Sequence, residues 1–454
     1  MRAFPIRTAL TIAMFVLMLA AASRFVHGVE APNPRTATAI VEFTPELTPL
    51  QPWRPHTVPE SIVPPRAAMR STLDDRNGGL DRFYAALWRT ERGAPLAITR
   101  ILHYGDSPTT ADLITGDTRQ LLQKRFGDAG HGFTLIGKPW AWYGHRGVDL
   151  SSHGWQMDPG TRWDLRNGLF GLGGVAFTGG TGGTGAFSRV TLRDPTQTRL
   201  EVWFLRQPNG GDIAISSGGQ PIGSIATGAP SRAAGFQSFE LKPGTGTLDF
   251  STEGAVRLFG ITLEKQKTGV VYDSVGLNGA SVSMLALIFN ESHWAEELRH
   301  RNPDLVVLNY GTNESGFAAF LTREYEKELR EAIRRVRTAL PNASILVMSP
   351  MDRGQKNGGE IETLPTIPRI VEIQRRVAAE LGCGFFNTFE AMGGAGTMAR
   401  WYDSQPRLVS ADFIHPTPAG ARIVATAFVR ELTLGLNRYK LHQVLKPNTV
   451  AEVR

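Results

Sequence analysis

The chain of 454 residues contains one cysteine, Cys383, so it forms no internal disulfide. Its stability must therefore come from packing in a sizeable core, which a chain of this length can build. Cys383 lies in the apolar stretch LGCGFFNT. We interpret it as a small core residue rather than as a nucleophile.

Clustered basic residues are also absent. The formal net charge is +7, but Lys and Arg are dispersed and form no block interleaved with aromatic residues. Three arginines fall within the first 28 residues, so a mature chain that begins near Val29 carries 46 basic and 42 acidic residues, about +4. We therefore expect no nucleic-acid partner.

Long hydrophobic runs are scarce, and the clearest one is N-terminal. Residues 1–28 place Arg2 and Arg7 before an apolar run from about Thr8 to Ala22. This pattern is typical of a secretory signal peptide, and the run is short for a membrane-spanning helix. An uncleaved N-terminal anchor, with tethering to the inner membrane, is the alternative. We expect an exported protein of the periplasm or cell envelope.

The remaining chain changes character several times. Pro and Thr dominate 29–67, which predicts an extended linker. Strand and helix patterns then alternate, except at 133–269, where short β-like runs follow one another with Gly, Pro and Asn turns. The predicted domains are a signal peptide or anchor at 1–28, a linker at 29–67, a discontinuous α/β domain at 68–132 and 270–440, an inserted domain at 133–269 and a C-terminal tail at 441–454.

Alternating strands and helices predict a doubly wound parallel sheet covered on both faces. The inserted domain is predicted to be an antiparallel β-sandwich or jelly roll. The Gly-rich stretch at 171–187 lacks the GK[ST] ending of a phosphate loop, so it predicts hairpin turns. Helices are expected at 80–93, 110–127, 322–340, 365–382 and 417–432, strands at 96–105, 343–350 and 383–388, and a strand with its exit loop at 303–314.

Four polar stretches follow predicted strands or lie in loops of the α/β domain. In an open α/β sheet, reactive groups gather at the carboxyl ends of the strands. We therefore expect these stretches to meet at one edge of the sheet. They are GDS at 105–107, GLNGAS at 276–281, GTNES at 311–315 and DFIHP at 412–416.

Together the four stretches contain the groups that acyl transfer requires. The Ser107 hydroxyl needs a base, and a neutral His415 imidazole can serve as one. Asp412, three residues earlier, can hold the second ring nitrogen of His415. The Asn313 amide and the backbone N–H groups of Gly279 and Ser107 can stabilise an oxyanion. Each stretch alone is a common turn or cap sequence, so their order along the chain carries the prediction.

The four stretches resemble the serine, glycine, asparagine and Asp-x-x-His blocks of the SGNH, or GDSL-type, hydrolase superfamily. This resemblance implies a flavodoxin-like sheet and a carboxylic ester hydrolase. It implies a catalytic triad of Ser107, His415 and Asp412, and an oxyanion hole of Gly279, Asn313 and the Ser107 amide, with Gly276 as the alternative to Gly279.

Within the superfamily, HYGDSPTTADLITGDTRQLLQKRFGDAGHGF is similar to the sequence of peptidoglycan O-acetylesterases. Members of that group carry a carbohydrate-binding-module-like β-domain between the serine and glycine blocks, where the insertion falls here. Pro108 departs from the His or aliphatic residue expected at its position. The resemblance implies removal of acetyl groups from the 6-hydroxyl of N-acetylmuramic acid, with no cofactor and no metal.

Two other functions remain open from the sequence. A polysaccharide O-acetyltransferase would use the same Ser-His-Asp site and differ only in the acceptor of the acetyl group. A non-catalytic glycan-binding envelope protein would keep the scaffold without the reaction. The sequence fixes neither the acetylated polymer nor the oligomeric state, since fold-level analogy does not set the substrate.

The remaining polar and aromatic residues receive structural interpretations. Asp106 is expected to be a turn residue. Turn or surface positions are expected for three histidines that lack metal-ligand spacing: His131, His145 and His153. Burial is expected, with sugar stacking as the alternative, for Trp140, Trp142, Tyr143 and Trp155.

Overall fold

The computed structural model describes residues 71–161, 167–180 and 185–445, all within one compact unit. The predicted signal peptide or anchor and the predicted linker lie outside these residues. None of the helices in the described ranges combines the length and the apolar character needed to cross a membrane.

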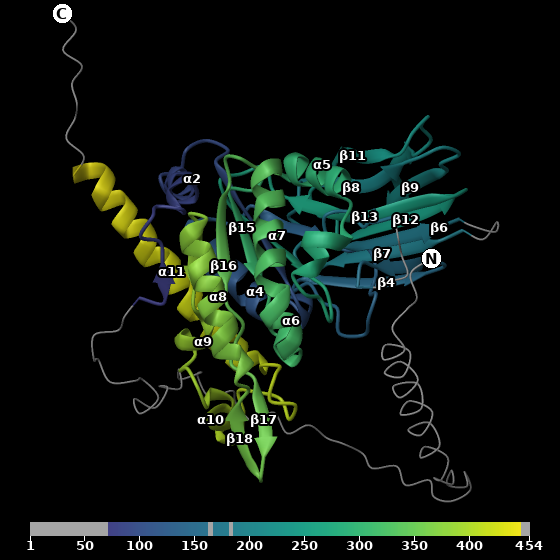
Figure 1. The fold of residues 1–454 in the computed structure, drawn as a ribbon. Helices are drawn as coiled ribbons and strands as arrows, with labels where there is room; N and C mark the ends of the chain where they lie inside the picture. Colours follow the sequence, from purple (N-terminus) through teal and green to yellow (C-terminus); the bar gives the residue numbers. More distant parts are fainter. Residues whose placement is uncertain (1–70, 162–166, 181–184, 446–454) are drawn as a thin grey trace, which may run out of the picture. The chain divides into compact units, whose positions relative to one another are not determined.

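The central sheet has six strands in the order β1-β19-β16-β15-β2-β14. Two of them, β15 and β16, are labelled in Figure 1. Five of them are parallel, and β1 pairs antiparallel to β19 at one edge. Numbered along the chain, the parallel strands lie in the order 2-1-3-4-5, which is the flavodoxin-like arrangement. The bounds are β1 Leu73–Asp74, β2 Ile98–Gly105, β14 Gly269–Gly276, β15 Leu305–Asn309, β16 Ser344–Met348 and β19 Gly384–Phe386.

Helices cover both faces of this sheet because neighbouring strand residues point to opposite sides. Ile101 and Val307 belong to one buried cluster, together with residues of α2, α4 and α11. Leu102 and Leu308 belong to a second, together with residues of α5, α7 and α8. The predicted doubly wound fold is confirmed. The helices are α2 Asp81–Glu91, α4 Ile114–Phe126, α5 Glu291–Arg301, α7 Tyr325–Ala339, α8 Thr366–Glu380 and α11 Pro418–Leu445.

Short elements account for several differences from the predicted helices. The helix expected at 110–127 is two helices, α3 Ser107–Thr110 and α4, separated by Asp112 in the left-handed conformation with φ of 53°. The helix expected at 322–340 is interrupted at Glu324, and α11 continues into the predicted tail. The other short elements are η3 Met284–Ile288, η4 Glu314–Gly316, α6 Ala318–Arg323, β17 Gly354–Asn357, β18 Glu360–Thr363, α9 Thr388–Ala391 and α10 Thr397–Asp403.

The β-rich insertion consists of two antiparallel sheets, ordered β10-β9-β12-β7-β4 and β11-β8-β13-β6-β5, with β3 also pairing to β13. Apolar residues of both sheets share one buried cluster. The bounds are β3 Gly130–Thr134, β4 Val148–His153, β5 Gln156–Pro159, β6 Val175–Gly179, β7 Phe187–Leu192, β8 Arg199–Arg206, β9 Asp212–Ser217, β10 Gln220–Ala226, β11 Ala233–Glu240, β12 Thr247–Glu253 and β13 Val256–Glu264.

The sequence predicts hairpin turns in the Gly-rich stretch at 171–187. This prediction is wrong for the connection from β6 to β7, which is not a hairpin. These two strands flank its second half but belong to different sheets. The chain therefore crosses from one sheet to the other here. The assignment of the insertion as a carbohydrate-binding module stays a prediction.

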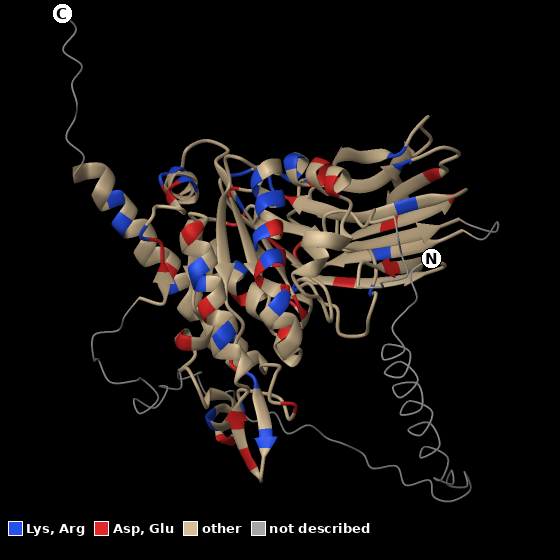
Figure 2. Cartoon of the chain, in the orientation of Figure 1, with Lys and Arg blue, Asp and Glu red and all other residues tan. Residues whose placement is uncertain are grey.

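Charged residues of both signs are interspersed along α7 and α8 (Figure 2). Glu326 of α7 accepts hydrogen bonds from Arg330, one turn later, and from Arg376 of α8. These side chains remain about one-third to one-half exposed. They form a solvated face of the sheet's helical layer, where individual ion pairs contribute little to stability.

Candidate active site

The four polar stretches identified from the sequence meet at the carboxyl edge of the central sheet. Gly105 ends β2 and lies opposite Gly276, the last residue of β14, and opposite Asn309, the last residue of β15. The fourth stretch, at 412–416, immediately precedes α11. This edge therefore collects residues that are up to about 300 positions apart in the sequence.

Ser107 occupies the first position of the short helix α3, directly after the corner that ends β2. The corner requires glycine at position 105, because a Cβ there would lie 2.2 Å from the Thr109 Oγ1 atom. Asp106 sits in the corner as expected, but its side chain is only 3% exposed. Burial raises the pKa of Asp106 to about 6, although a hydrogen bond with Thr312 and the nearby His415 ring oppose the rise.

A continuous hydrogen-bonded chain links Ser107, His415 and Asp412. The Ser107 Oγ atom lies 2.7 Å from His415 Nε2, and His415 Nδ1 lies 2.6 Å from Asp412 Oδ2. The other carboxylate oxygen, Oδ1, accepts the backbone N–H groups of Ile414 at 2.9 Å and His415 at 3.0 Å. Burial alone would raise the pKa of Asp412, but these hydrogen bonds from His415 and Ile414 outweigh it and lower the pKa.

The loop after β14 distinguishes the two candidate glycines. A Cβ at Gly276 would lie 2.2 Å from the Thr110 backbone nitrogen, so Gly276 is packed against α3. Gly279 is exposed, has φ of 72° and has no atom within 4 Å of the Cβ position. Its N–H donates to no group in the described part of the chain. The geometry favours Gly279 as the oxyanion donor.

The Asn313 side chain lies beside this loop. Its Nδ2 atom donates one hydrogen bond to the Ala280 carbonyl oxygen at 2.7 Å. A primary amide has two N–H donors, so one stays free for an oxyanion. The Ser107 N–H at the start of α3 is a third donor, because the first N–H groups of a helix have no partner within it.

The sequence did not point to Glu314, the residue after Asn313. Its side chain is 2% exposed, and its two carboxylate oxygens accept the backbone N–H groups of Val282 at 2.8 Å and Gly311 at 3.0 Å. Glu314 thus joins the loop that carries Gly279 to the loop that carries Asn313. Burial raises the pKa of Glu314 to about 7.

The segment between β3 and β4 packs over α3. Trp140 Nε1 donates to Thr110 Oγ1 at 3.1 Å, and the Gly144 N–H donates to the Thr110 carbonyl oxygen at 3.1 Å. Tyr143 is buried and Trp140 partly buried, as expected. The expected burial is wrong for Trp142, whose side chain is 54% exposed.

One of the three histidines expected at turns or surfaces is instead buried. His145 is 3% exposed, and its ring lies 5.7 Å from that of His131, measured between centroids. Burial lowers the pKa of both, to about 4 for His131. Across the ranges that the structure describes, no group of three His, Cys, Asp or Glu side chains is arranged to hold a metal ion.

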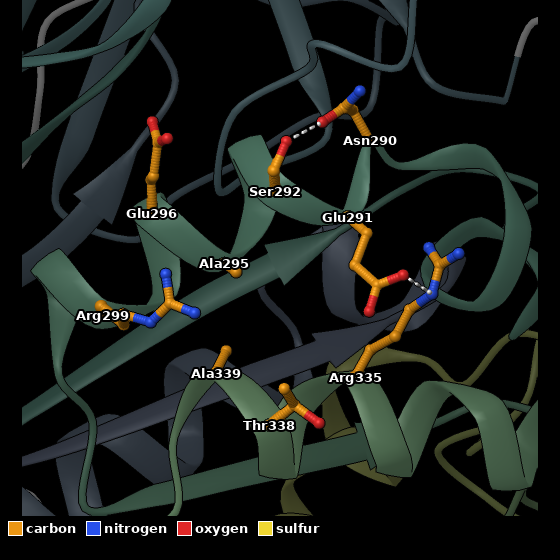
Figure 3. Close-up of a pocket in the computed structure, with 9 residues that line it drawn as sticks. All are labelled: Asn290, Glu291, Ser292, Ala295, Glu296, Arg299, Arg335, Thr338 and Ala339. Carbon is orange, nitrogen blue, oxygen red and sulfur yellow. Dashed lines mark hydrogen bonds and ion pairs between the residues drawn. The ribbon is translucent and has the colours of Figure 1, made fainter.

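A pocket of about 500 Å³ lies between α5 and α7, apart from the Ser107 edge (Figure 3). Within the pocket, Ser292 Oγ donates to Asn290 Oδ1 at 2.9 Å, and Arg335 Nε lies 3.7 Å from Glu291 Oε2. It contains none of the residues of the hydrogen-bonded chain. We therefore assign the chemistry to the carboxyl edge of the sheet and not to this pocket.

Comparisons with known proteins agree with this fold. The family model described as the GDSL-like lipase/acylhydrolase family matches residues 231–423, which include Gly279, Asn313, Asp412 and His415 but not Ser107. No curated protein matches the chain. A solved structure of a peptidoglycan O-acetylesterase shares 23% identity with a TM-score of 0.68, over 81% of this chain and 99% of the other.

Two further solved structures resemble only part of the chain. An acetylxylan esterase from Geobacillus stearothermophilus shares 23% identity over 36% of this chain and 73% of its own, with a TM-score of 0.28. An α/β hydrolase from the metagenome of Lake Arreo, Spain, shares 22% identity over 36% of this chain and 73% of its own, with a TM-score of 0.27. The peptidoglycan O-acetylesterase structure is therefore the match that supports the fold.

Proposed function

We propose that the chain is a carboxylic ester hydrolase of the SGNH, or GDSL-like, type that removes O-acetyl groups from a polysaccharide of the cell envelope. The observation that carries this proposal is the chain of hydrogen bonds from Ser107 Oγ through His415 to Asp412. It lies at the edge of the sheet where Gly279 and Asn313 offer free N–H donors. The same groups fit any acetyl ester, so the substrate needs separate support.

In the first half of the proposed reaction, Ser107 Oγ attacks the acetyl carbonyl carbon while His415 Nε2 takes the hydroxyl proton. Asp412 accepts the Nδ1–H hydrogen bond, which fixes the tautomer and stabilises the imidazolium. The negative charge that develops on the carbonyl oxygen is held by the N–H groups of Ser107, Gly279 and Asn313. His415 then gives its proton to the departing sugar oxygen, which leaves an acetyl group on Ser107.

In the second half, water takes the place of the sugar alcohol. His415 removes a proton from water, and the hydroxide attacks the acetyl carbonyl carbon in the same oxyanion site. Collapse of the intermediate breaks the bond to Ser107 Oγ, which recovers its proton from His415. The products are acetate and the free polysaccharide hydroxyl group.

Peptidoglycan carrying 6-O-acetyl-N-acetylmuramic acid is the substrate we propose. Support comes from the structural similarity to a peptidoglycan O-acetylesterase, which covers 81% of this chain and so includes at least part of the β-rich insertion. The export signal predicted at residues 1–28 would bring the enzyme to the periplasm or cell envelope, where this polymer lies.

The decisive experiment measures acetate release from O-acetylated peptidoglycan and from acetylated xylan. We expect the wild-type protein to release acetate preferentially from peptidoglycan and the Ser107→Ala variant to release none above background. A folded Ser107→Ala variant with normal turnover would refute the nucleophile. Acetate release from xylan alone would refute the substrate, and transfer of acetyl to an added glycan instead of water would indicate a transferase.

A further inference from the structure

We infer that the exposed indole of Trp142 is a stacking platform for the sugar ring that carries the acetyl ester. This inference rests on the proposed function and specifies which part of the protein recognises the sugar. Trp142 is 54% exposed, although the aromatic residues on both sides of it are anchored in the protein. Single exposed aromatic residues are common on protein surfaces, so it is the place of Trp142 next to the candidate site that points to a role.

Hydrogen bonds place the Trp142 ring beside the oxyanion site. Its Nε1 atom donates to Asn278 Oδ1 at 3.3 Å, and Asn278 immediately precedes Gly279. The indole edge is therefore tied to the loop that would hold the reacting carbonyl oxygen. The indole thus lies next to the residue that precedes the candidate oxyanion donor.

The platform is held rigidly by its neighbours. Trp140 donates to Thr110 Oγ1, and Thr110 Oγ1 donates to the Gly276 carbonyl oxygen at 2.8 Å. On the other side, the Tyr143 hydroxyl accepts the N–H of Leu135 at 3.0 Å. Because the flanking residues fix the backbone, little conformational entropy would be lost when a ligand contacts Trp142.

The chemistry of an indole face fits a saccharide. An aromatic face is electrically negative and its edge positive. The C–H groups on one face of a pyranose carry weak positive charge and form a flat apolar surface of similar size. With its N–H engaged by Asn278, the indole leaves its ring faces as the free surface. The segment that carries Trp142 lies between β3 and β4, so the predicted insertion contributes to substrate recognition at the ester site.

Binding tests the platform separately from catalysis. In the inactive Ser107→Ala background, calorimetry would measure the Kd for soluble O-acetylated glycan fragments of peptidoglycan. We expect Trp142→Ala to weaken binding about tenfold and Trp142→Phe, which keeps a ring, by less than about threefold. Leu96→Ala is the control, since Leu96 is 69% exposed but precedes the amino end of β2. It should leave the Kd unchanged.

Kinetics in the active enzyme distinguish a sugar platform from a structural role. For Trp142→Ala, kcat/KM should fall about tenfold more for the glycan fragments than for 4-nitrophenyl acetate, through KM rather than kcat. Equal losses on both substrates, or an unchanged Kd, would overturn the platform. Failure of the wild-type protein to release acetate from the glycan, with Trp142-dependent binding intact, would instead overturn the proposed function.

Discussion

At the scale of single residues, the two carboxylate oxygens of Asp412 have separate roles. Oδ2 accepts the His415 ring N–H, whereas Oδ1 accepts two backbone N–H groups that shape the loop. In Asp412→Asn, the amide oxygen can keep the backbone contacts, but the Nδ2 group then faces His415 Nδ1. The imidazole would adopt the opposite tautomer, with a proton on Nε2 that prevents it from accepting the Ser107 proton.

We therefore expect Asp412→Asn to lower kcat for a small acetyl ester by about 10⁴-fold with little change in thermal stability. The measurement is steady-state hydrolysis together with a thermal unfolding curve. Asp403→Asn, at the end of α10, is a control for the loss of one carboxylate. A loss of less than tenfold in Asp412→Asn would show that His415 does not depend on this carboxylate.

The titration of Glu314 makes the free energy of unfolding depend on pH. Burial raises the pKa of Glu314 from 4.5 to about 7, so the folded chain binds this proton more tightly than the unfolded chain does. The contribution of Glu314 to the free energy of unfolding therefore declines as the pH rises from about 4.5 to about 7. A neutral glutamine does not titrate and removes this decline.

The expected result for Glu314→Gln is a change in how stability depends on pH. Relative to the variant, the wild-type protein should lose on the order of 3 kcal/mol of unfolding free energy across this pH window. Denaturant unfolding at several pH values measures the difference, with Glu372→Gln on the exposed face of α8 as the control. Parallel pH profiles for the wild type and Glu314→Gln would contradict a raised pKa.

At the scale of elements, α11 is held by a close approach between helices. A Cβ at Gly435 of α11 would lie 1.9 Å from the hydroxyl oxygen of Tyr84 in α2, whose side chain is 2% exposed. Glycine to alanine inside a helix ordinarily stabilises by about 1 kcal/mol. Here the added methyl group must displace a buried ring, so the sign should reverse.

We expect Gly435→Ala to lower the free energy of unfolding by about 1–3 kcal/mol. Denaturant unfolding measures this loss. Tyr84→Phe removes the hydroxyl that meets the methyl group, and that hydroxyl has no hydrogen-bond partner in the described structure. The double variant should therefore recover part of the stability. Stabilisation by Gly435→Ala alone would show that the two helices do not approach this closely.

The elements that the sequence predicts well are those with long periodic patterns. The buried strands of the central sheet read as continuous apolar runs because both of their faces are covered. By contrast, β1 has two residues and no pattern to detect. The break between α3 and α4 depends on Asp112, which adopts a left-handed conformation and pairs with buried Arg119. Such a break follows from tertiary contacts rather than from local sequence.

The candidate site divides in the same way. The stretches that contain Ser107, Asp412 and His415 could be identified because their residue types are specific to one chemistry and their order along the chain is distinctive. Glu314 could not, because its partner Val282 lies 32 residues away and a glutamate in a polar loop ordinarily faces solvent. The exposure of Trp142 depends on how Trp140 and Tyr143 are anchored, and the pattern of aromatic residues alone does not show which one projects outward.

At the scale of the whole molecule, a buried ion network ties the β-insertion to the central sheet. Glu264, at the end of β13, accepts hydrogen bonds from Arg100 of β2 at 2.8 Å and from Arg301 of α5 at 2.6 Å. Arg301 also donates to Asp273 of β14 at 2.6 Å. The side chains of Glu264, Arg301 and Asp273 are at most 8% exposed. Removing the charge of Glu264 would leave buried Arg301 with one carboxylate partner instead of two, and Arg100 without its carboxylate partner.

Glu264→Gln should therefore lower the free energy of unfolding at neutral pH by about 3–5 kcal/mol. Burial would raise the pKa of Glu264, but Arg301 and Arg100 outweigh it and lower the pKa to about 2. The stabilisation is present above about pH 4.5 and is lost as the pH falls toward 2. The variant should thus be less acid-sensitive than the wild type.

Tryptophan fluorescence and far-UV circular dichroism can follow both parts of the molecule in the same unfolding experiment. Because one apolar cluster runs from the insertion to a face of the sheet, we expect the two signals to shift together in Glu264→Gln. Glu253→Gln, at the exposed end of β12, is the control and should leave both midpoints unchanged. Separate transitions in the wild type would show that the insertion unfolds on its own and that Glu264 does not couple it to the central sheet.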